Sequence, residues 1–175
     1  MNNFIQLLRV IDEQLYARQF PRLEHIIMQA NFSSLVGEFV GTSIPKHCNT
    51  VVRNRYHNGH PDLIPAGTFP NDSAQHSSEG IEIKASRYLQ GWQGHNPEEV
   101  WLLVFCFECN ARGDEEKGVS PIPFRFLNVF GAKLDRSDWT YSGRSKTSRR
   151  TITASVKKSG YEKMARNWIY RADAE

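Results

Sequence analysis

Eight consecutive residues near the middle of the chain are apolar: residues 100–107 read Val-Trp-Leu-Leu-Val-Phe-Cys-Phe. The run predicts a β-strand that is apolar on both faces. Because successive side chains of a strand point to opposite faces, such a strand lies inside a sheet that is covered on both sides. The chain is therefore expected to form a layered α/β core rather than a barrel with one open face.

The length of 175 residues predicts one domain, spanning 1–175, with N-terminal helices and a basic C-terminal segment. Apolar residues recur at helical spacing over residues 2–18 and again over 22–30. A short helix is expected over residues 33–41, capped by Ser33 or Ser34. Further strands are expected at 49–56, 80–86, 124–134 and 151–156, and a short helix at 157–166. The end of the chain, with Trp168 and Tyr170, is expected to dock back on the domain.

The charge of the chain is unevenly distributed. Residues 144–175 contain nine Lys or Arg and three Asp or Glu, a net charge of +6, so the other 143 residues carry −3 of the total +3. A basic C-terminal quarter indicates a polyanionic partner, although a basic solvated tail would look the same. The natural phosphate contacts are Arg144, Lys146, Arg149 and Arg150.

The three cysteines, Cys48, Cys106 and Cys109, are too few for a disulfide framework. A zinc site at Cys106 and Cys109 is disfavoured, because no second ligand pair has zinc spacing and a strand would place the two on opposite faces. Buried free thiols in a reducing cytosol are expected instead. No stretch approaches the roughly 20 apolar residues of a membrane span, and the N-terminus has no signal-like apolar block. We therefore expect a cytoplasmic protein with no membrane partner.

Residues 80–86, Gly-Ile-Glu-Ile-Lys-Ala-Ser, alternate as a half-buried strand does. Glu82 and Lys84 share one face and the isoleucines share the other. Asp62, which follows Pro61 in a turn-rich segment, can bring a second carboxylate to the same place. Two acidic oxygens and a backbone carbonyl suit a hard cation such as Mg²⁺, and a lysine suits an anionic substrate. The alternative is a loop aspartate beside the solvated face of an edge strand.

Pro61-Asp62 and Glu82-Ile83-Lys84 together resemble the PD-(D/E)xK nuclease superfamily, particularly the type II restriction endonucleases. The resemblance implies a central mixed β-sheet flanked by helices and Mg²⁺-dependent hydrolysis of DNA. It implies that Asp62, Glu82 and the carbonyl of Ile83 hold the metal, and that Lys84 positions water or stabilises charge. Many relatives carry an acidic residue on the helix before the first strand, which Glu38 matches. In that superfamily a helix commonly follows the lysine strand, and Gly91 and Gly94 depart from this pattern.

The surrounding segments offer further candidates. Gln90 and Gln93, in a loop expected over residues 86–99, could read base edges, whereas a loop packed by Trp92 is the plainer interpretation. The turn at 57–60 holds two histidines that could bind a metal, and His60 could contact a phosphate. Asp72 and Glu79, in a loop expected to be mobile without a ligand, are reserve metal ligands.

A restriction enzyme that cuts both strands of a symmetric site is expected to be a homodimer. The first candidate surface is the face of the N-terminal helix with Phe4, Leu8, Ile11 and Leu15, and the second is the segment with Trp168 and Tyr170. Two other functions remain open: a structure-specific nuclease, such as a junction resolvase or repair nicking enzyme, and a DNA-binding module without catalysis.

Overall fold

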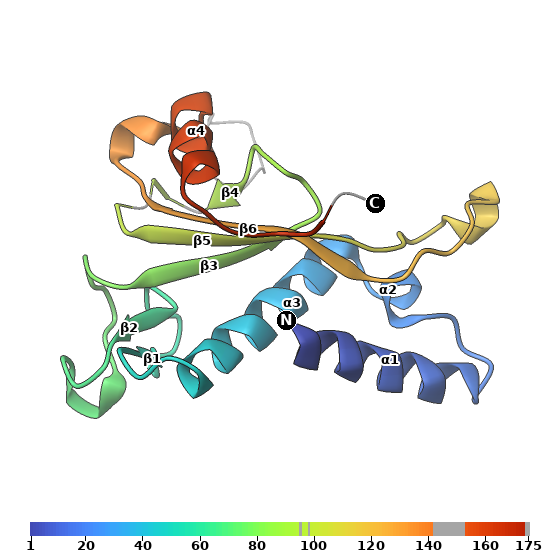
Figure 1. Cartoon of the computed structure of the whole chain (residues 1–175). Helices are drawn as coiled ribbons and strands as arrows, with labels where there is room; N and C mark the ends of the chain where they lie inside the picture. Colours follow the sequence, from blue (N-terminus) through green and yellow to red (C-terminus); the bar gives the residue numbers. More distant parts are fainter. Residues whose placement is uncertain (95, 98, 142–152, 174–175) are drawn as a thin grey trace, which may run out of the picture.

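The computed structural model describes residues 1–94, 96–97, 99–141 and 153–173 (Figure 1). Its helices are α1 (Asn2–Tyr16), α2 (Leu23–Ile26), α3 (Gln29–Ser43) and α4 (Lys158–Arg166). Its strands are β1 (Val51–Arg53), β2 (Leu63–Pro65), β3 (Ile81–Ser86), β4 (Gln93–Gly94), β5 (Trp101–Glu108), β6 (Arg125–Lys133), β7 (Trp139–Tyr141), β8 (Ala154–Val156) and β9 (Trp168–Arg171). Short 3₁₀ turns are η1 (Ile44–Lys46), η2 (Pro70–Asp72), η3 (Glu115–Lys117) and η4 (Arg136–Asp138). Within the described ranges, no helix is long and apolar enough to cross a membrane.

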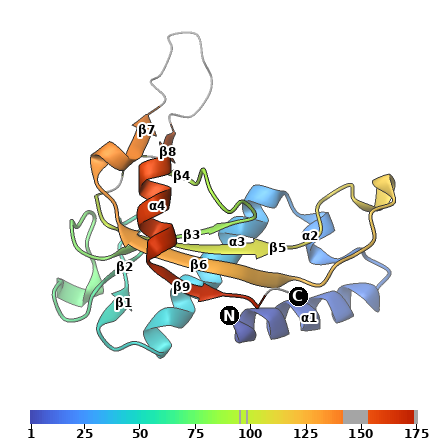
Figure 2. The same ribbon diagram turned by 45° about the horizontal axis from the view of Figure 1, so that its top comes forward.

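The main sheet has six strands in the order β1-β2-β3-β5-β6-β9 and is mixed. Strands β3 and β5 are parallel, with Glu82 opposite Leu102 and Lys84 opposite Val104, and the other neighbouring strands are antiparallel. The apolar strand β5 therefore lies inside the sheet, as its sequence predicts. Strand β9 pairs with β6 at one edge, which confirms that the end of the chain docks back (Figure 2).

A separate hydrophobic core covers each face of this sheet. Helices α1 and α3 lie on one side of the sheet and α4 lies on the other (Figure 1). Phe105 and Phe107 of β5 belong to the core on the side of α1 and α3, whereas Leu102, Val104 and Cys106 belong to the core that includes α4 and the small sheet β4-β8-β7. The expectation of an α/β fold with a mixed central sheet is confirmed.

Two of the three free cysteines lie in the two cores, whereas Cys48 is half-buried and belongs to neither. Cys106 and Cys109 are both unpaired by disulfides and buried, and they belong to different cores. Burial raises the pKa of each thiol to about 12. These two thiols are therefore packing residues, as the sequence predicts.

The helix boundaries near the N-terminus differ from the prediction. Residues 22–30 are not one helix, because the backbone is extended at Ile27 and Met28, between α2 and α3. Helix α3 then begins at Gln29 with Met28 as its N-cap, so Ser33 and Ser34 lie inside the helix rather than at its start. The Ser34 hydroxyl donates to the Ala30 carbonyl oxygen at 3.0 Å, which is how a serine is accommodated within a helix.

The N-terminal helix uses its predicted dimer face within the chain. Phe4 and Leu8 are only 1% and 3% exposed, and Phe4 contacts the rings of Phe32, Phe39 and Phe124. Phe4 and Leu8 therefore cover the core and are not available to a second copy, whereas Ile11 and Leu15 are half-buried. The predicted dimer surface on α1 loses two of its four side chains, and the dimer itself stays a prediction. In the second candidate segment, Trp168 is exposed.

A buried asparagine fixes the turns around the candidate site. The Asn54 amide nitrogen donates to the carbonyl oxygens of Pro61 and Ala74, at 3.1 and 2.7 Å. Its side-chain oxygen accepts from the backbone N–H groups of Tyr56 and Ala74, both at 3.1 Å. A Cβ at Gly59 would lie 2.6 Å from both the Ala74 oxygen and the Asn54 amide, so only glycine fits there. The loop after β2, predicted to be mobile without a ligand, is thus tied to β1 by hydrogen bonds within the chain.

Replacing this amide should loosen the turns and lower stability. Asn54→Ala leaves buried backbone groups of Pro61 and Ala74 without partners. We expect a loss of about 2–4 kcal/mol in the free energy of unfolding, measured by urea denaturation. Gln75→Ala, at an exposed position of the same loop, is the control and should change it by no more than about 0.5 kcal/mol. Equal stability of the two variants would contradict this role for Asn54.

Candidate active site

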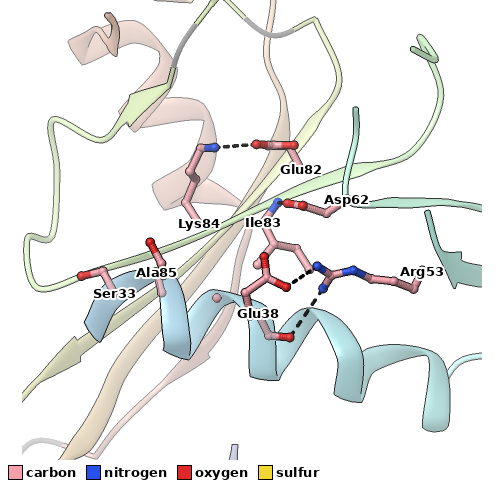
Figure 3. A pocket seen from close by; sticks show the side chains of 10 residues that line it. Ser33, Glu38, Arg53, Asp62, Glu82, Ile83, Lys84 and Ala85 are labelled. Carbon is pink, nitrogen blue, oxygen red and sulfur yellow. Dashed lines mark hydrogen bonds and ion pairs between the residues drawn. The ribbon is translucent and has the colours of Figure 1, made fainter. Parts of the chain in front are cut away.

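Asp62 reaches the edge of strand β3 because the pairing of β2 with β3 is short. The β2–β3 pairing includes only Leu63 with Ile81, so the residues of β3 after Ile81 are not paired with β2. Asp62, the residue before β2, lies beside them instead. There Asp62 Oδ2 accepts a hydrogen bond from the backbone N–H of Ile83 at 2.8 Å (Figure 3). In an extended strand the N–H and C=O of one residue point to the same side, so the Ile83 carbonyl faces this edge as well.

Glu82 and Lys84 point away from the core beneath β3, as the alternation predicts. Ile83 is packed in the core with α3, and the Glu82 and Lys84 side chains rise together from the opposite face of the strand (Figure 3). Lys84 Nζ lies 2.5 Å from Glu82 Oε1, and His60 Nδ1 lies 2.9 Å from Glu82 Oε2. Glu82 is only 8% exposed, so both of its oxygens are held by cationic or hydrogen-bonding partners in a largely dry position.

The two carboxyl groups respond oppositely to this environment. Burial acts to raise the pKa of Glu82, but the His60 hydrogen bond and the Lys84 ammonium outweigh it and lower the pKa to about 2. Burial and the neighbouring Glu82 carboxylate raise the pKa of Asp62, against the hydrogen bond from Ile83. The site therefore concentrates negative charge that a cation near Asp62 would neutralise.

Glu38 and Arg53 form the opposite wall of the same cavity. This cavity, of about 230 Å³, lies between α3 and the edge of β3 and includes Asp62, Glu82 and Lys84 in its lining. Glu38, on α3, forms an ion pair with Arg53 of β1 (Figure 3). A Cβ at Gly41 would lie 2.6 Å from Arg53 Nη1, so this glycine leaves the space that the guanidinium occupies.

Other candidates lie elsewhere. Gln90 and Gln93 are exposed and line neither this cavity nor a second one beside His60, and Gln93 belongs to β4 of the small sheet. Asp72 and Glu79 likewise line neither cavity. Trp92, which follows β3 in the chain, is buried, as the packing interpretation of this segment predicts. The basic residues Arg144, Lys146, Arg149 and Arg150 lie outside the described residues.

The sequence suggests His60 as a metal ligand or phosphate contact, but it does not predict the contact of His60 with Glu82. Two further residues are not assigned to the site from the sequence: Arg53, the partner of Glu38, and Asn54, which holds the surrounding turns. The position of His60, two residues before Asp62, is the one signal in the sequence that could have suggested its contact. Arg53 and Asn54 carry no such signal, because their partners are distant in the chain.

The atoms that Asp62, Glu82 and Ile83 offer to a metal are all oxygens. Over the described parts of the chain, no three His, Cys, Asp or Glu side chains are grouped to hold one metal ion. Asp62, Glu82 and the Ile83 carbonyl nevertheless offer hard oxygen ligands at one edge of β3, and Mg²⁺ usually binds one or two carboxylates and keeps several waters. The residues present therefore fit Mg²⁺ better than a softer metal.

No family model, curated protein or solved structure matches this chain.

The lowered pKa of Glu82 predicts an acid-sensitive contribution to stability. A carboxyl group whose pKa is lower in the folded state stabilises the fold above its unfolded pKa, and this is lost as the pH falls through the folded pKa. The contribution of Glu82 should thus be complete above about pH 4.5 and disappear toward about pH 2. Its size is at most on the order of 3 kcal/mol, because repulsion by Asp62 opposes it.

Urea denaturation of the wild type and of Glu82→Gln, from pH 7 to pH 2, measures this contribution. We expect Glu82→Gln to cost stability near neutral pH and progressively less below about pH 4.5. The matched control is Glu79→Gln, an exposed carboxyl group close to β3. A cost of Glu82→Gln that is independent of pH would contradict the assigned pKa.

Proposed function

We propose that this protein is a magnesium-dependent endonuclease that hydrolyses phosphodiester bonds of double-stranded DNA, with the sequence specificity of a type II restriction enzyme. One observation carries the proposal: Asp62 and Glu82, distant in the chain, meet around Ile83 at the edge of β3, with Lys84 beside Glu82. This arrangement supports the resemblance of Pro61-Asp62 and Glu82-Ile83-Lys84 to the PD-(D/E)xK superfamily.

The order of the elements supports a restriction-endonuclease-like core. Helix α3, which carries Glu38, precedes strand β1, and the mixed sheet has helices on both sides. One departure concerns the connection from β3 to β5: the described residues there contain the short strand β4 and no helix. We therefore place this chain as a divergent form of that fold.

Asp62, Glu82 and the carbonyl of Ile83 would hold Mg²⁺. When bound, Mg²⁺ lowers the pKa of a coordinated water and stabilises negative charge on a phosphate. We assign Asp62 as the ligand with most to gain, because burial and the Glu82 charge already raise its pKa.

Lys84 is the cation of the site closest to Glu82. Its ion pair with Glu82 favours donation to a phosphate oxygen or orientation of the attacking water over abstraction of a proton. Arg53, across the cavity, is positioned by Glu38, so we assign Glu38 to organising the cavity and count it as an accessory metal ligand only.

DNA binding would rely on the basic residues of the C-terminal quarter, and cleavage of both strands would need two copies of the chain. Because Phe4 and Leu8 are buried, the remaining candidate for a two-fold interface is the edge strand β9 with its exposed Trp168. We place such an enzyme in the cytoplasm, where it meets DNA.

The central test is cleavage of a supercoiled plasmid in Mg²⁺ or in EDTA. We expect Asp62→Asn, Glu82→Gln and Lys84→Met each to reduce the cleavage rate by about 10²–10⁴-fold, with each factor of ten equal to about 1.4 kcal/mol of barrier. Glu38→Gln should cost much less. Folding is monitored by circular dichroism.

Wild-type protein that binds DNA without cutting it would contradict the proposal and favour a non-catalytic DNA-binding module. Cutting confined to branched substrates would favour a structure-specific nuclease. Glu116→Gln, at an exposed carboxyl group that lines neither the cavity between α3 and β3 nor the one beside His60, is the charge-matched control for the active-site substitutions.

The basic segment predicts a salt-dependent loss of affinity. Replacing Arg144, Lys146, Arg149 and Arg150 with Ala should weaken binding to all DNA sequences. The slope of log affinity against log salt should fall by about 0.9 for each lost phosphate contact, as measured by fluorescence anisotropy. The control set carries the same number of changes to Ala at Lys46, Arg112, Lys117 and Lys133, which lie outside the C-terminal quarter, and an equal effect of the two sets would show only a non-specific charge effect.

A further inference from the structure

A second and larger cavity lies on the histidine side of the carboxylate pair. It has a volume of about 620 Å³, within the range of small-ligand sites, and its lining includes Asp62 and Glu82, which also line the cavity beside α3. The other lining residues used below are Asn58, His60, His76 and Ser78. We call this cavity the histidine groove. The two carboxylates thus form a wall shared by two neighbouring cavities.

The two cavities differ in charge. The cavity beside α3 contains Arg53 and Lys84, which suit a phosphate. None of the described residues that line the histidine groove is Lys or Arg, and Glu99 adds a further carboxyl group to it. A phosphate would therefore be favoured beside α3, and a neutral group that forms hydrogen bonds would be favoured in the histidine groove.

The histidine groove presents groups suited to a nucleobase. Asn58 and Ser78 are exposed, and within the described residues no hydrogen bond occupies either side chain. His76 is also exposed and stacks on His60, with ring centroids 5.6 Å apart and planes at 22°. An amide offers both a donor and an acceptor to a base edge, and an exposed aromatic ring offers a stacking surface.

These groups are held in place by the backbone rather than left on loose loops. The N–H of His60 donates to the Gln75 carbonyl oxygen at 3.1 Å, and the N–H of Ser77 donates to the His60 carbonyl oxygen at 2.9 Å. Asn58 adopts a positive φ of 57° in the turn that Asn54 and Gly59 fix. A ligand would therefore meet a preorganised wall, which lowers the entropy lost on binding.

We propose that the histidine groove binds a nucleobase that is flipped out of the duplex next to the scissile phosphate, with Asn58 contacting the base edge and His76 stacking on the base. These two residues, and not Gln90 and Gln93, determine the sequence preference of the protein. The inference rests on the proposed function in that DNA is taken as the substrate.

The test is selection of bound duplexes from a randomised DNA library by the full chain in Ca²⁺, which uses the same kind of oxygen ligands as Mg²⁺. We expect Asn58→Ala and His76→Ala to reduce discrimination at one or two neighbouring base positions by about 5–100-fold, as for loss of a specific base contact. The slope of affinity against salt should not change, because no phosphate contact is lost. His76→Phe, which keeps a ring for stacking, should retain most of the preference.

The matched control is the double variant Gln90→Ala/Gln93→Ala, which should select the same sequences as the wild type. Unchanged preference in both groove variants would overturn the inference, as would a wild type without preference. Uniformly weaker binding with a slope reduced by about 1 would also overturn it, because the groove would then hold a phosphate. Selective binding that the groove variants lose, in a protein that cuts no plasmid in Mg²⁺, would support the inference and overturn only the proposed nuclease activity.

Discussion

The parallel pairing of β3 with β5 is the constraint on which both cores and the candidate site depend. It places Glu82 opposite Leu102 and Lys84 opposite Val104, so the polar face of β3 continues into the apolar face of β5 beneath α4. The other face carries Ile83 and Phe105 into the core under α3. Since a shift of one residue would exchange these faces, packing of Ile81 and Ile83 against the core under α3 fixes the carboxylate and the ammonium on the opposite face of the strand.

Buried polar contacts, rather than regular pairing, then complete the site. Strand β2 pairs with β3 at a single residue pair, and Asp62 occupies the next donor of the edge through its side chain. The backbone N–H of Asn54 donates to the Asp62 carbonyl oxygen at 2.9 Å, while the Asn54 side chain holds the turns on either side. A buried amide with all of its hydrogen bonds made is stabilising, but it tolerates no substitution that leaves one partner unmatched.

The sequence predicts the central strands of the main sheet better than it predicts the side-chain contacts at the candidate site. The apolar run of 100–107 and the alternation of 81–84 require an interior strand and a two-faced neighbour, and both occur as β5 and β3. The predicted start of α3 at Ser33 or Ser34 is wrong, because the backbone is extended at Met28 and the helix begins at Gln29. A serine inside a helix can donate its hydroxyl to a backbone carbonyl of the preceding turn, as Ser34 does. The meeting of Asp62 with Glu82 came from a motif resemblance, whereas the contact of His60 with Glu82 depends on a turn that no local pattern specifies.

The pKa values of Asp62 and Glu82 are shifted in opposite directions, unlike those of carboxyl groups exposed on a protein surface. Glu82 is stabilised as an anion by Lys84 and His60, and its charge in turn makes ionisation of Asp62 harder. A protein that needed only stability would gain by replacing Asp62, whose pKa is raised, with a neutral side chain. Retaining both keeps two carboxylates on the wall shared by the two cavities, where they would attract a divalent cation, while Arg53 and Lys84 of one cavity would attract a phosphate. The unfavourable electrostatic energy therefore arises at the residues that would carry out the chemistry under the proposed function.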